Sequence, residues 1–262
     1  MKILPLIVCL SLILISCEKE LDFKYHDIDP VLVIEGRLSQ TGANVTLTNT
    51  TPMGEPLENI TLTDAEVTIK DMTDNVPYYL SPDKDGIFIA EFPVFPRHDY
   101  LLSVKRGDKR YESECMLYSA IEIVDLNFNW IQMPYDMVAL LNISFRKLDD
   151  KDACYWTRIY KNGTPYKWQL SHGSGAVDGI LKQTLFTTRK NPEDENDRSV
   201  LKPGDRLEVV ISGISLEMYD YLTAIQSDSN GKPMFTGDFC LGYFLASEEA
   251  KAEIIFGGYG SE

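Results

Sequence analysis

Apolar and polar residues alternate in short runs along most of this chain. In one such run, Ala65, Val67 and Ile69 are separated by polar residues. A period of two places alternate side chains on opposite faces of a β-strand, so each run predicts a strand with one buried face. Residues typical of tight turns, such as Asn162 followed by Gly163, separate many of the runs. The pattern predicts an all-β fold.

The spacing of the candidate strands predicts two β-sandwich units. About seven strands fit between residues 31 and 118, which is the size of an Ig-like or fibronectin-like sandwich. The strand pattern restarts near Ile123, so we expect a second sandwich over residues 119–262. This second unit contains the one short helix that the sequence predicts, near residues 215–226, with Ser215 as its N-cap. The buried stripe of this helix is expected to consist of Leu216, Tyr219, Leu222 and Ile225.

We expect the first residues to form a targeting segment that is not part of the fold. Behind Lys2, an apolar run over residues 3–15 has the length of a signal-peptide core and is shorter than the roughly 20 residues of a membrane-spanning helix. It ends in Leu14-Ile15-Ser16-Cys17, which resembles the lipobox of bacterial lipoproteins, where the cysteine thiol is acylated and the chain is cut before it. We therefore expect a lipoprotein signal peptide over residues 1–16 and lipid attachment at Cys17. A secretory signal with a coincidental cysteine is the alternative.

Acidic residues directly follow the expected lipid-attachment site. Glu18, Lys19, Glu20 and Asp22 belong to a segment, residues 17–30, that we expect to be a lipidated acidic tether. These four residues resemble the export signal that sends lipoproteins of Bacteroidota to the outer face of the outer membrane; a solvated tether without this role is the alternative. Each buried methylene of an acyl chain contributes about 0.8 kcal/mol, so two or three chains anchor a protein stably. We expect a lipid-anchored, surface-exposed protein of the outer membrane, with outer-membrane lipid as a partner.

The charge balance argues against polyanionic partners. The chain has 25 basic and 40 acidic side chains, which gives a net charge of −15. Binding to nucleic acid needs a basic surface that displaces counterions from phosphates, and no basic stripe is visible in the sequence. We therefore expect no nucleic-acid partner.

The cysteines and histidines form no metal-binding pattern. Of five cysteines, Cys9 lies in the predicted signal peptide and Cys17 is the predicted lipid-attachment residue directly after it, which leaves Cys115, Cys154 and Cys240. These three allow one disulfide and one free thiol, or three buried thiols, and the sequence does not choose between the two arrangements. No C-x-x-C or C-x-x-H spacing occurs, and the three histidines lie in separate segments. We expect no bound metal and no cofactor.

Motifs for catalysis are weak. Ser174 stands between two glycines, but a nucleophile elbow needs a glycine two residues away on each side, so this segment is expected to be a flexible loop. The 40 acidic residues make every carboxylate spacing available, so a glycosidase pair cannot be located. Residues 83–86 are expected to form a hairpin turn and not a calcium loop. The sequence therefore predicts a protein that is not an enzyme.

Aromatic residues gather in the second predicted unit: Trp130, Tyr135, Trp156, Tyr160, Tyr166 and Trp168. Trp156, Arg158 and Tyr160 share one face of a predicted strand, and the residues between them take the other face, so at least one of these faces should be core. Tyr166 and Trp168 follow a predicted turn and are the members of this cluster most expected to be exposed; packing in the core is the alternative for each member. Exposed aromatic rings stack on flat ligands, so these two residues are the candidate binding surface for a glycan or peptide.

Five segments carry a resemblance to a known family: Cys17-Glu18-Lys19-Glu20, residues 32–36, residues 64–67, the helix over residues 216–225, and Leu241-Gly242-Tyr243-Phe244. The chain resembles, over nearly its whole mature length, a Bacteroidota outer-membrane lipoprotein family known as domain of unknown function 4249. The resemblance implies a lipoprotein that is often associated with TonB-dependent transporters, and it supplies no catalytic residues. We expect a surface-anchored, non-enzymatic binding or accessory module. A surface hydrolase of glycan or peptide, with catalytic residues from distant segments, and a purely structural envelope protein are the alternatives.

Overall fold

The computed structural model describes residues 29–51, 60–150, 153–227, 229 and 231–260. The predicted signal peptide, the lipid-attachment residue Cys17 and the predicted export signal (Glu18, Lys19, Glu20 and Asp22) lie outside the described residues. The chain divides into two compact units, residues 1–30 with 51–57, and residues 31–50 with 58–262; the strands and the helix described below belong to the second. Among the described residues, no helix has both the length and the apolar content that crossing a membrane requires.

The described chain consists largely of β-strands, which confirms the predicted all-β class. The strands of the first half are β1 (Leu32–Ser39), β2 (Gly42–Asn49), β3 (Glu66–Asp71), β4 (Val76–Pro82), β5 (Phe88–Glu91), β6 (Asp99–Arg106) and β7 (Lys109–Met116). The later elements are β8 (Ile123–Gln132), β9 (Met137–Arg146), β10 (Cys154–Lys161), β11 (Thr164–His172), the short 3-10 helix η1 (Gly173–Gly175), β12 (Ile180–Arg189), β13 (Arg206–Ile214), α2 (Leu216–Gln226), β14 (Thr236–Gly237), β15 (Leu241–Ala246) and β16 (Ala250–Ile255).

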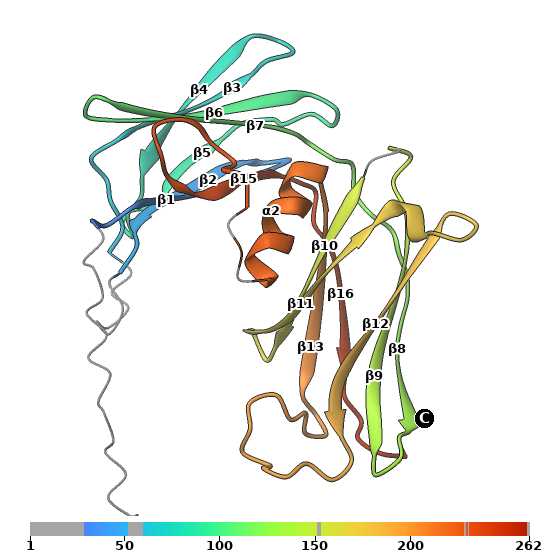
Figure 1. Cartoon of the computed structure of the whole chain (residues 1–262). Helices are drawn as coiled ribbons and strands as arrows, with labels where there is room; N and C mark the ends of the chain where they lie inside the picture. Colours follow the sequence, from blue (N-terminus) through green and yellow to red (C-terminus); the bar gives the residue numbers. More distant parts are fainter. Residues whose placement is uncertain (1–28, 52–59, 151–152, 228, 230, 261–262) are drawn as a thin grey trace, which may run out of the picture. The chain divides into compact units, whose positions relative to one another are not determined.

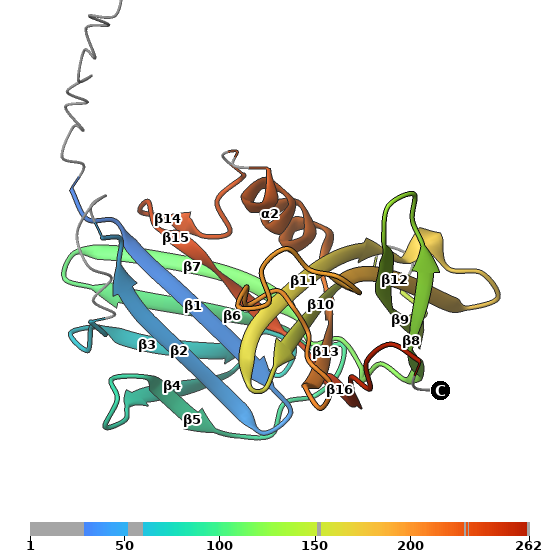
Figure 2. The same cartoon turned by 90° about the horizontal axis from the view of Figure 1, so that it is seen from below.

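Strands β1 to β7 form a nine-stranded sheet together with β14 and β15, in the order β14-β7-β6-β3-β4-β5-β2-β1-β15. Its neighbours are antiparallel except β1 and β15, which are parallel. Strand β15 also contacts β7, near the opposite end of this order, so the sheet folds back on itself around a core that includes Ile34, Tyr100 and Phe244. Figures 1 and 2 show the two resulting layers, with β1, β2 and β15 in one and β3, β6 and β7 in the other.

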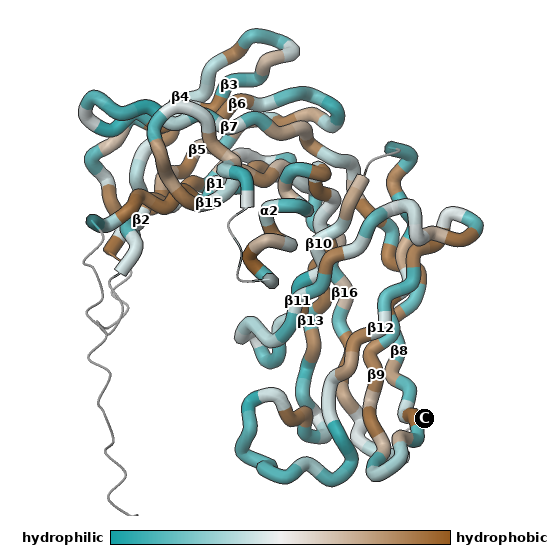
Figure 3. The backbone as a smooth tube through the Cα atoms, in the orientation of Figure 1, coloured by the Kyte–Doolittle hydropathy of each residue, from teal (hydrophilic) through white to brown (hydrophobic). Residues whose placement is uncertain are grey.

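The remaining long strands form a second sandwich. One sheet has the order β11-β10-β13-β16 and the other the order β12-β9-β8, and the core between them includes Leu141, Phe145 and Tyr155. Seven antiparallel strands in sheets of four and three are typical of Ig-like domains, so the predicted sandwich class is confirmed. In Figure 3, hydrophobic residues follow β9, whereas the connection from β12 to β13, which contains the predicted exposed loop of residues 191–197, is hydrophilic.

Besides the direct link from β7 to β8, a long connection between β13 and β16 joins the two sandwiches. Between β13 and β16 of the second sandwich the chain forms α2 and β14, and then β15, which pairs with β1 of the nine-stranded sheet from Val33↔Leu241 to Leu38↔Ala246. This pairing joins a strand of the first predicted unit, residues 31–118, to a strand of the second, residues 119–262. The boundary between the two units stays a prediction. The connection therefore brings elements of both sandwiches together.

Helix α2 begins where the sequence predicts, since the Ser215 hydroxyl accepts a hydrogen bond from the backbone N–H of Met218 at 3.2 Å. Its predicted buried stripe is partly wrong. Met218 and Leu222 are the buried helix residues, whereas Leu216 is 41% exposed and Ile225 is 49% exposed. The helix contacts β10 and β11, and this contact selects a face centred on Met218 and Leu222, one turn apart.

None of Cys115, Cys154 and Cys240 forms a disulfide. Cys154 and Cys240 are buried, and Cys115 is half-buried. Burial raises the pKa of the Cys240 thiol to about 12 and raises the pKa of the Cys115 thiol well above its ordinary value. The sequence leaves open either one disulfide and one free thiol or three thiols. The structure has the second arrangement, in which the thiols act as small hydrophobic groups.

Candidate functional site

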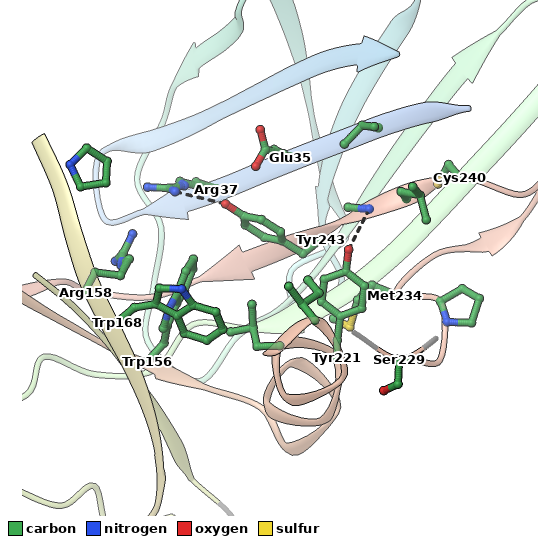
Figure 4. A pocket seen from close by; sticks show the side chains of 18 of the residues that line it. Glu35, Arg37, Trp156, Arg158, Trp168, Tyr221, Ser229, Met234, Cys240 and Tyr243 are labelled. Atoms are coloured by element: carbon green, nitrogen blue, oxygen red, sulfur yellow. Dashed lines mark hydrogen bonds between the residues drawn. The ribbon is translucent and has the colours of Figure 1, made fainter. Parts of the chain in front are cut away.

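A cavity of about 1000 Å³ lies beside one face of β10. Its walls come from β1, β10, β11 and β15, and from α2 with the loop that follows it (Figure 4). Sites for small molecules typically have roughly 300–1000 Å³ and are lined mainly by apolar and aromatic side chains. The aromatic and apolar lining residues are Val33, Trp156, Ile159, Tyr160, Pro165, Tyr166, Trp168, Tyr221, Leu222, Ile225, Pro233, Met234, Phe239, Leu241 and Tyr243.

Strand alternation explains how β10 forms the cavity wall. Trp156, Arg158 and Tyr160 line the cavity, whereas Tyr155 belongs to the core of the second sandwich; Ile159 belongs to this core and also forms part of the cavity lining. The prediction that one face of this strand is core is therefore confirmed. The other face is the one that carries the chemistry of the site.

Four aromatic rings form the central part of the cavity. The ring of Trp156 meets the rings of Trp168 and Tyr243 edge to face, with centroids 6.3 and 6.0 Å apart. On the helix side, the Tyr221 hydroxyl accepts a hydrogen bond from the backbone N–H of Gly242 in β15 at 3.1 Å. Since the rings come from β10, β11, α2 and β15, the cavity depends on all these elements being in place.

Tyr166 and Trp168 both line this cavity, but neither is fully exposed. The Tyr166 hydroxyl lies 3.0 Å from the carbonyl oxygen of Thr187 and 2.7 Å from that of Ser199, and burial raises its pKa. Trp168 packs against Trp156. Tyr135 is the fully exposed member of the predicted aromatic cluster, because it lies in the turn between β8 and β9. The assignment of Tyr166 and Trp168 to a binding surface stays a prediction.

Two arginines lie at one end of the cavity. Arg158 is only 5% exposed, and its Nη2 donates hydrogen bonds to Ser212 Oγ at 2.7 Å and to Glu249 Oε1 at 2.6 Å. Its guanidinium carbon lies 4.5 Å from the centroid of the Trp156 ring, a cation–π geometry. Arg37 Nη2 donates to the Tyr243 hydroxyl at 3.1 Å. The guanidinium groups are thus held against the aromatic rings.

Neighbouring charges and hydrogen bonds keep the Arg37 guanidinium and the Glu249 carboxylate charged. Burial acts to lower the pKa of Arg37, but Tyr243 and Glu249 outweigh burial and the pKa is raised. Burial acts to raise the pKa of Glu249, but the Arg158 guanidinium and Lys251 outweigh burial and the pKa is lowered. Two polar atoms at this end, Arg158 Nε and Trp156 Nε1, are buried and have no hydrogen-bond partner among the described protein atoms. Such atoms are rare in folded proteins and often mark functional sites.

Replacing Arg158 by methionine is expected to destabilise the fold by about 2 kcal/mol. The Glu249 carboxylate then loses its charged hydrogen bond, although Lys251 Nζ stays 3.4 Å from its other oxygen and the side chain is 29% exposed, which keeps the cost below that of a fully buried pair. The Glu249→Gln variant should cost less, about 1 kcal/mol. Urea denaturation measures both, and a smaller loss in Arg158→Met than in Glu249→Gln would contradict this assignment.

Among the residues that the structure describes, one group of side chains could hold a metal ion on geometric grounds. Ligand atoms of Asp71, Asp74 and His98 lie within 4.8 Å of one another. However, His98 Nδ1 lies 2.8 Å from Asp71 Oδ2, and Asp71 Oδ1 accepts hydrogen bonds from the backbone N–H groups of Thr73 and Asp74 at 2.9 and 3.0 Å. Both oxygens of the buried carboxylate are therefore used within the protein, and we assign this group a structural role.

The His98–Asp71 pair predicts a pH dependence of stability. The hydrogen bond to Asp71 raises the pKa of His98 above 6.5. Burial acts to raise the pKa of Asp71, but the hydrogen bonds from His98 and the backbone outweigh burial and lower it below 3.8. The His98 contribution is complete below pH 6.5 and is lost as pH rises through its raised pKa; the Asp71 contribution is present above pH 3.8 and is lost as pH falls through its lowered pKa.

The pair should therefore stabilise the protein most between pH 3.8 and 6.5. The urea midpoint of the wild-type protein should fall between pH 6 and pH 9 by more than that of a His98→Ala variant. Asp74→Asn, which changes a carboxylate 4.0 Å from His98, is the control and should keep most of the wild-type dependence. Equal pH profiles for wild type and His98→Ala would contradict the assignment.

Sequence reasoning missed Arg37 and Tyr243 as site residues. Arg37 lies in β1 and Tyr243 in β15, and the two strands come together only through the parallel pairing. Arg158 was not selected as a site residue either. The pattern that could have indicated it is the alternation of Trp156, Arg158 and Tyr160 on the strand face opposite to Tyr155.

The fold and this site define a protein of two β-sandwiches with a ligand-sized cavity beside an aromatic strand face. The family described as Domain of unknown function (DUF4249) matches residues 18–251, and the chain belongs to this family. No curated protein matches the chain.

Two solved structures are similar to the chain over most of its length. A cytokine receptor complex shares 10% sequence identity at a TM-score of 0.29, with 89% of this chain and 98% of the other covered. A segment of two fibronectin type III domains from chicken tenascin shares 13% identity at a TM-score of 0.26, with 87% of this chain and 99% of the other covered.

Proposed function

We propose that this protein is a lipoprotein of a Bacteroidota outer membrane, anchored through acylated Cys17 and displayed on the cell surface. It acts as a non-enzymatic binding module and as an accessory to a TonB-dependent transporter, and its ligand site is the cavity between β1, β10, β11, β15 and α2. The observation that carries the binding role is the cavity itself, whose volume of about 1000 Å³ and aromatic lining suit a small ligand.

The chemistry of the lining supports binding over catalysis. A nucleophile needs an adjacent base or a lowered pKa. The thiol that lines the cavity, Cys240, has its pKa raised to about 12, so it is protonated at neutral pH. Ser229 lies with its hydroxyl 3.0 Å from that of Ser227, and the described residues that line the cavity include no histidine to act as its base. Arg37 and Arg158 instead supply fixed positive charge.

Affinity purification from outer membranes tests the accessory role. The full-length protein, carrying a C-terminal tag and expressed from its own locus, is solubilised in mild detergent and captured. We expect a TonB-dependent transporter to be recovered with it at near-equal amounts, and a tagged, unrelated surface lipoprotein serves as the control. Recovery of no transporter, or of equal amounts with the control, would overturn the accessory role and leave the ligand site to be tested on its own.

A further inference from the structure

We infer that the cavity binds an amphipathic anion, a small molecule in which one carboxylate or similar oxyanion is joined to an apolar body. This inference rests on the proposed function, since it takes the cavity to be a ligand site. It adds the chemical class of the ligand and the orientation in which it binds.

The charge of the lining is opposite to that of the molecule. The charged residues that line the cavity are Arg37, Arg158 and Lys167, which are cationic, and Glu35, which is anionic. The whole chain, in contrast, has a net charge of −15. A cationic lining in an anionic protein attracts an anion to this place specifically, and the apolar walls strengthen the attraction because they exclude water.

The arginines of the lining gather at one end of the cavity, where Trp156 and Trp168 also lie. Figure 4 shows Arg37 and Arg158 at one end, whereas Tyr221 and Met234 lie toward the other end. The cavity is also lined by exposed hydrophobic side chains: Ile225 is 49% exposed, Phe239 is 66% exposed and Leu241 is 40% exposed. A ligand with a charged head and an apolar body matches this arrangement, with the head at the arginines and the body along the rings.

Arg37 is the lining arginine that forms no ion pair with a described carboxylate, whereas Arg158 is paired with Glu249. Arg37 Nη2 makes one hydrogen bond, to the Tyr243 hydroxyl, and the Arg37 side chain makes no other hydrogen bond to described residues. A guanidinium has five N–H donors in a planar fork that suits the two oxygens of a carboxylate. Arg158 has an unpartnered donor, Nε, but its guanidinium is held through Nη2 by Ser212 and is already ion-paired with Glu249 at the same end of the cavity. We therefore assign the oxyanion contact to Arg37.

A pair of fluorescent probes tests the inference. 8-Anilinonaphthalene-1-sulfonate has an apolar body and one sulfonate, and N-phenyl-1-naphthylamine has nearly the same body without the charge. Both are titrated into wild type, Arg37→Gln and Arg206→Gln, where Arg206 is an exposed arginine on β13 paired with Glu253. We expect Arg37→Gln to weaken the anionic probe about tenfold and the neutral probe less than twofold, with no change in Arg206→Gln.

The outcomes separate the two proposals. Binding of neither probe would overturn the cavity as a ligand site, and with it the binding role. Binding of both probes with equal affinity, unaffected by Arg37→Gln, would keep the ligand site and overturn the anionic ligand. If circular dichroism shows that Arg37→Gln does not fold, Tyr243→Phe is used instead, because it removes the hydroxyl that holds Arg37. This variant should weaken binding of the anionic probe and leave binding of the neutral probe unchanged. An equal loss of binding for both probes would contradict the inference.

Displacement identifies the source of the ligand. Decanoate represents a carboxylate derived from lipid, and N-acetylphenylalanine one derived from peptide; decanol and N-acetylphenylalaninamide are their neutral counterparts. The inference is supported if one acid displaces the anionic probe at a concentration at least tenfold lower than its neutral counterpart requires. The acid that does so identifies the source of the ligand. Displacement by neither acid, or equally by acids and neutral counterparts, would overturn it.

Discussion

Alanine at Gly242 should destabilise the protein by more than about 3 kcal/mol. Gly242 has φ +108°, a conformation that residues with a Cβ rarely adopt, and a Cβ built there would overlap the carbonyl oxygen of Ile34. This overlap falls inside the parallel pairing of β1 and β15, so the substitution must push the two strands apart. It also disturbs the backbone N–H that donates to Tyr221.

Gly204→Ala is the matched control for this substitution. Gly204 has φ +95°, but a Cβ there would meet nothing within 4 Å, so only the backbone strain is added and a loss of about 1 kcal/mol is expected. Urea denaturation of both variants separates strain from overlap. The Gly242→Ala protein should also lose the anionic probe, because β1 and β15 both line the cavity. Equal losses of stability in the two variants would show that the overlap with the Ile34 carbonyl oxygen does not destabilise Gly242→Ala beyond the backbone strain.

The fold class could be predicted from the sequence because its signals are local. The alternation of Ala65, Val67 and Ile69 predicts a strand, and residues 66–71 form β3. Ser215 precedes the helix that it caps. These features depend on neighbours within a few residues, where periodicity and capping chemistry are decisive.

The site could be predicted only in part, because its residues meet through long-range pairing. Arg37 and Tyr243 are 206 residues apart in the sequence and share a hydrogen bond only because β15 joins β1. No local pattern reports which distant strand a given strand will pair with. The aromatic residues Tyr166 and Trp168 were selected from the sequence, since they follow a recognisable turn, but their half-buried state depends on β12 and Trp156.

The connection between β13 and β16 explains why the fold and the site depend on each other. In a simple sandwich such a connection is a short loop between neighbouring strands. Here it supplies α2, whose Leu222 and Ile225 line the cavity, and β15, whose Tyr243 lies between the rings and Arg37. The segment that completes the nine-stranded sheet therefore also closes the cavity, so changes in β15 should affect stability and binding together.

Replacing Cys17 by alanine is expected to abolish fatty-acid attachment and to remove the protein from the outer membrane. The acyl chains carried by this one thiol are the whole of the proposed anchor, and each buried methylene contributes about 0.8 kcal/mol to it. Fractionation after growth with an alkyne-labelled fatty acid measures both effects in full-length protein. Cys9→Ala is the control, because Cys9 lies within the predicted signal peptide, and this variant should remain labelled and membrane-bound. An unlabelled Cys17→Ala protein that stays in the outer-membrane fraction would show that another contact anchors the chain.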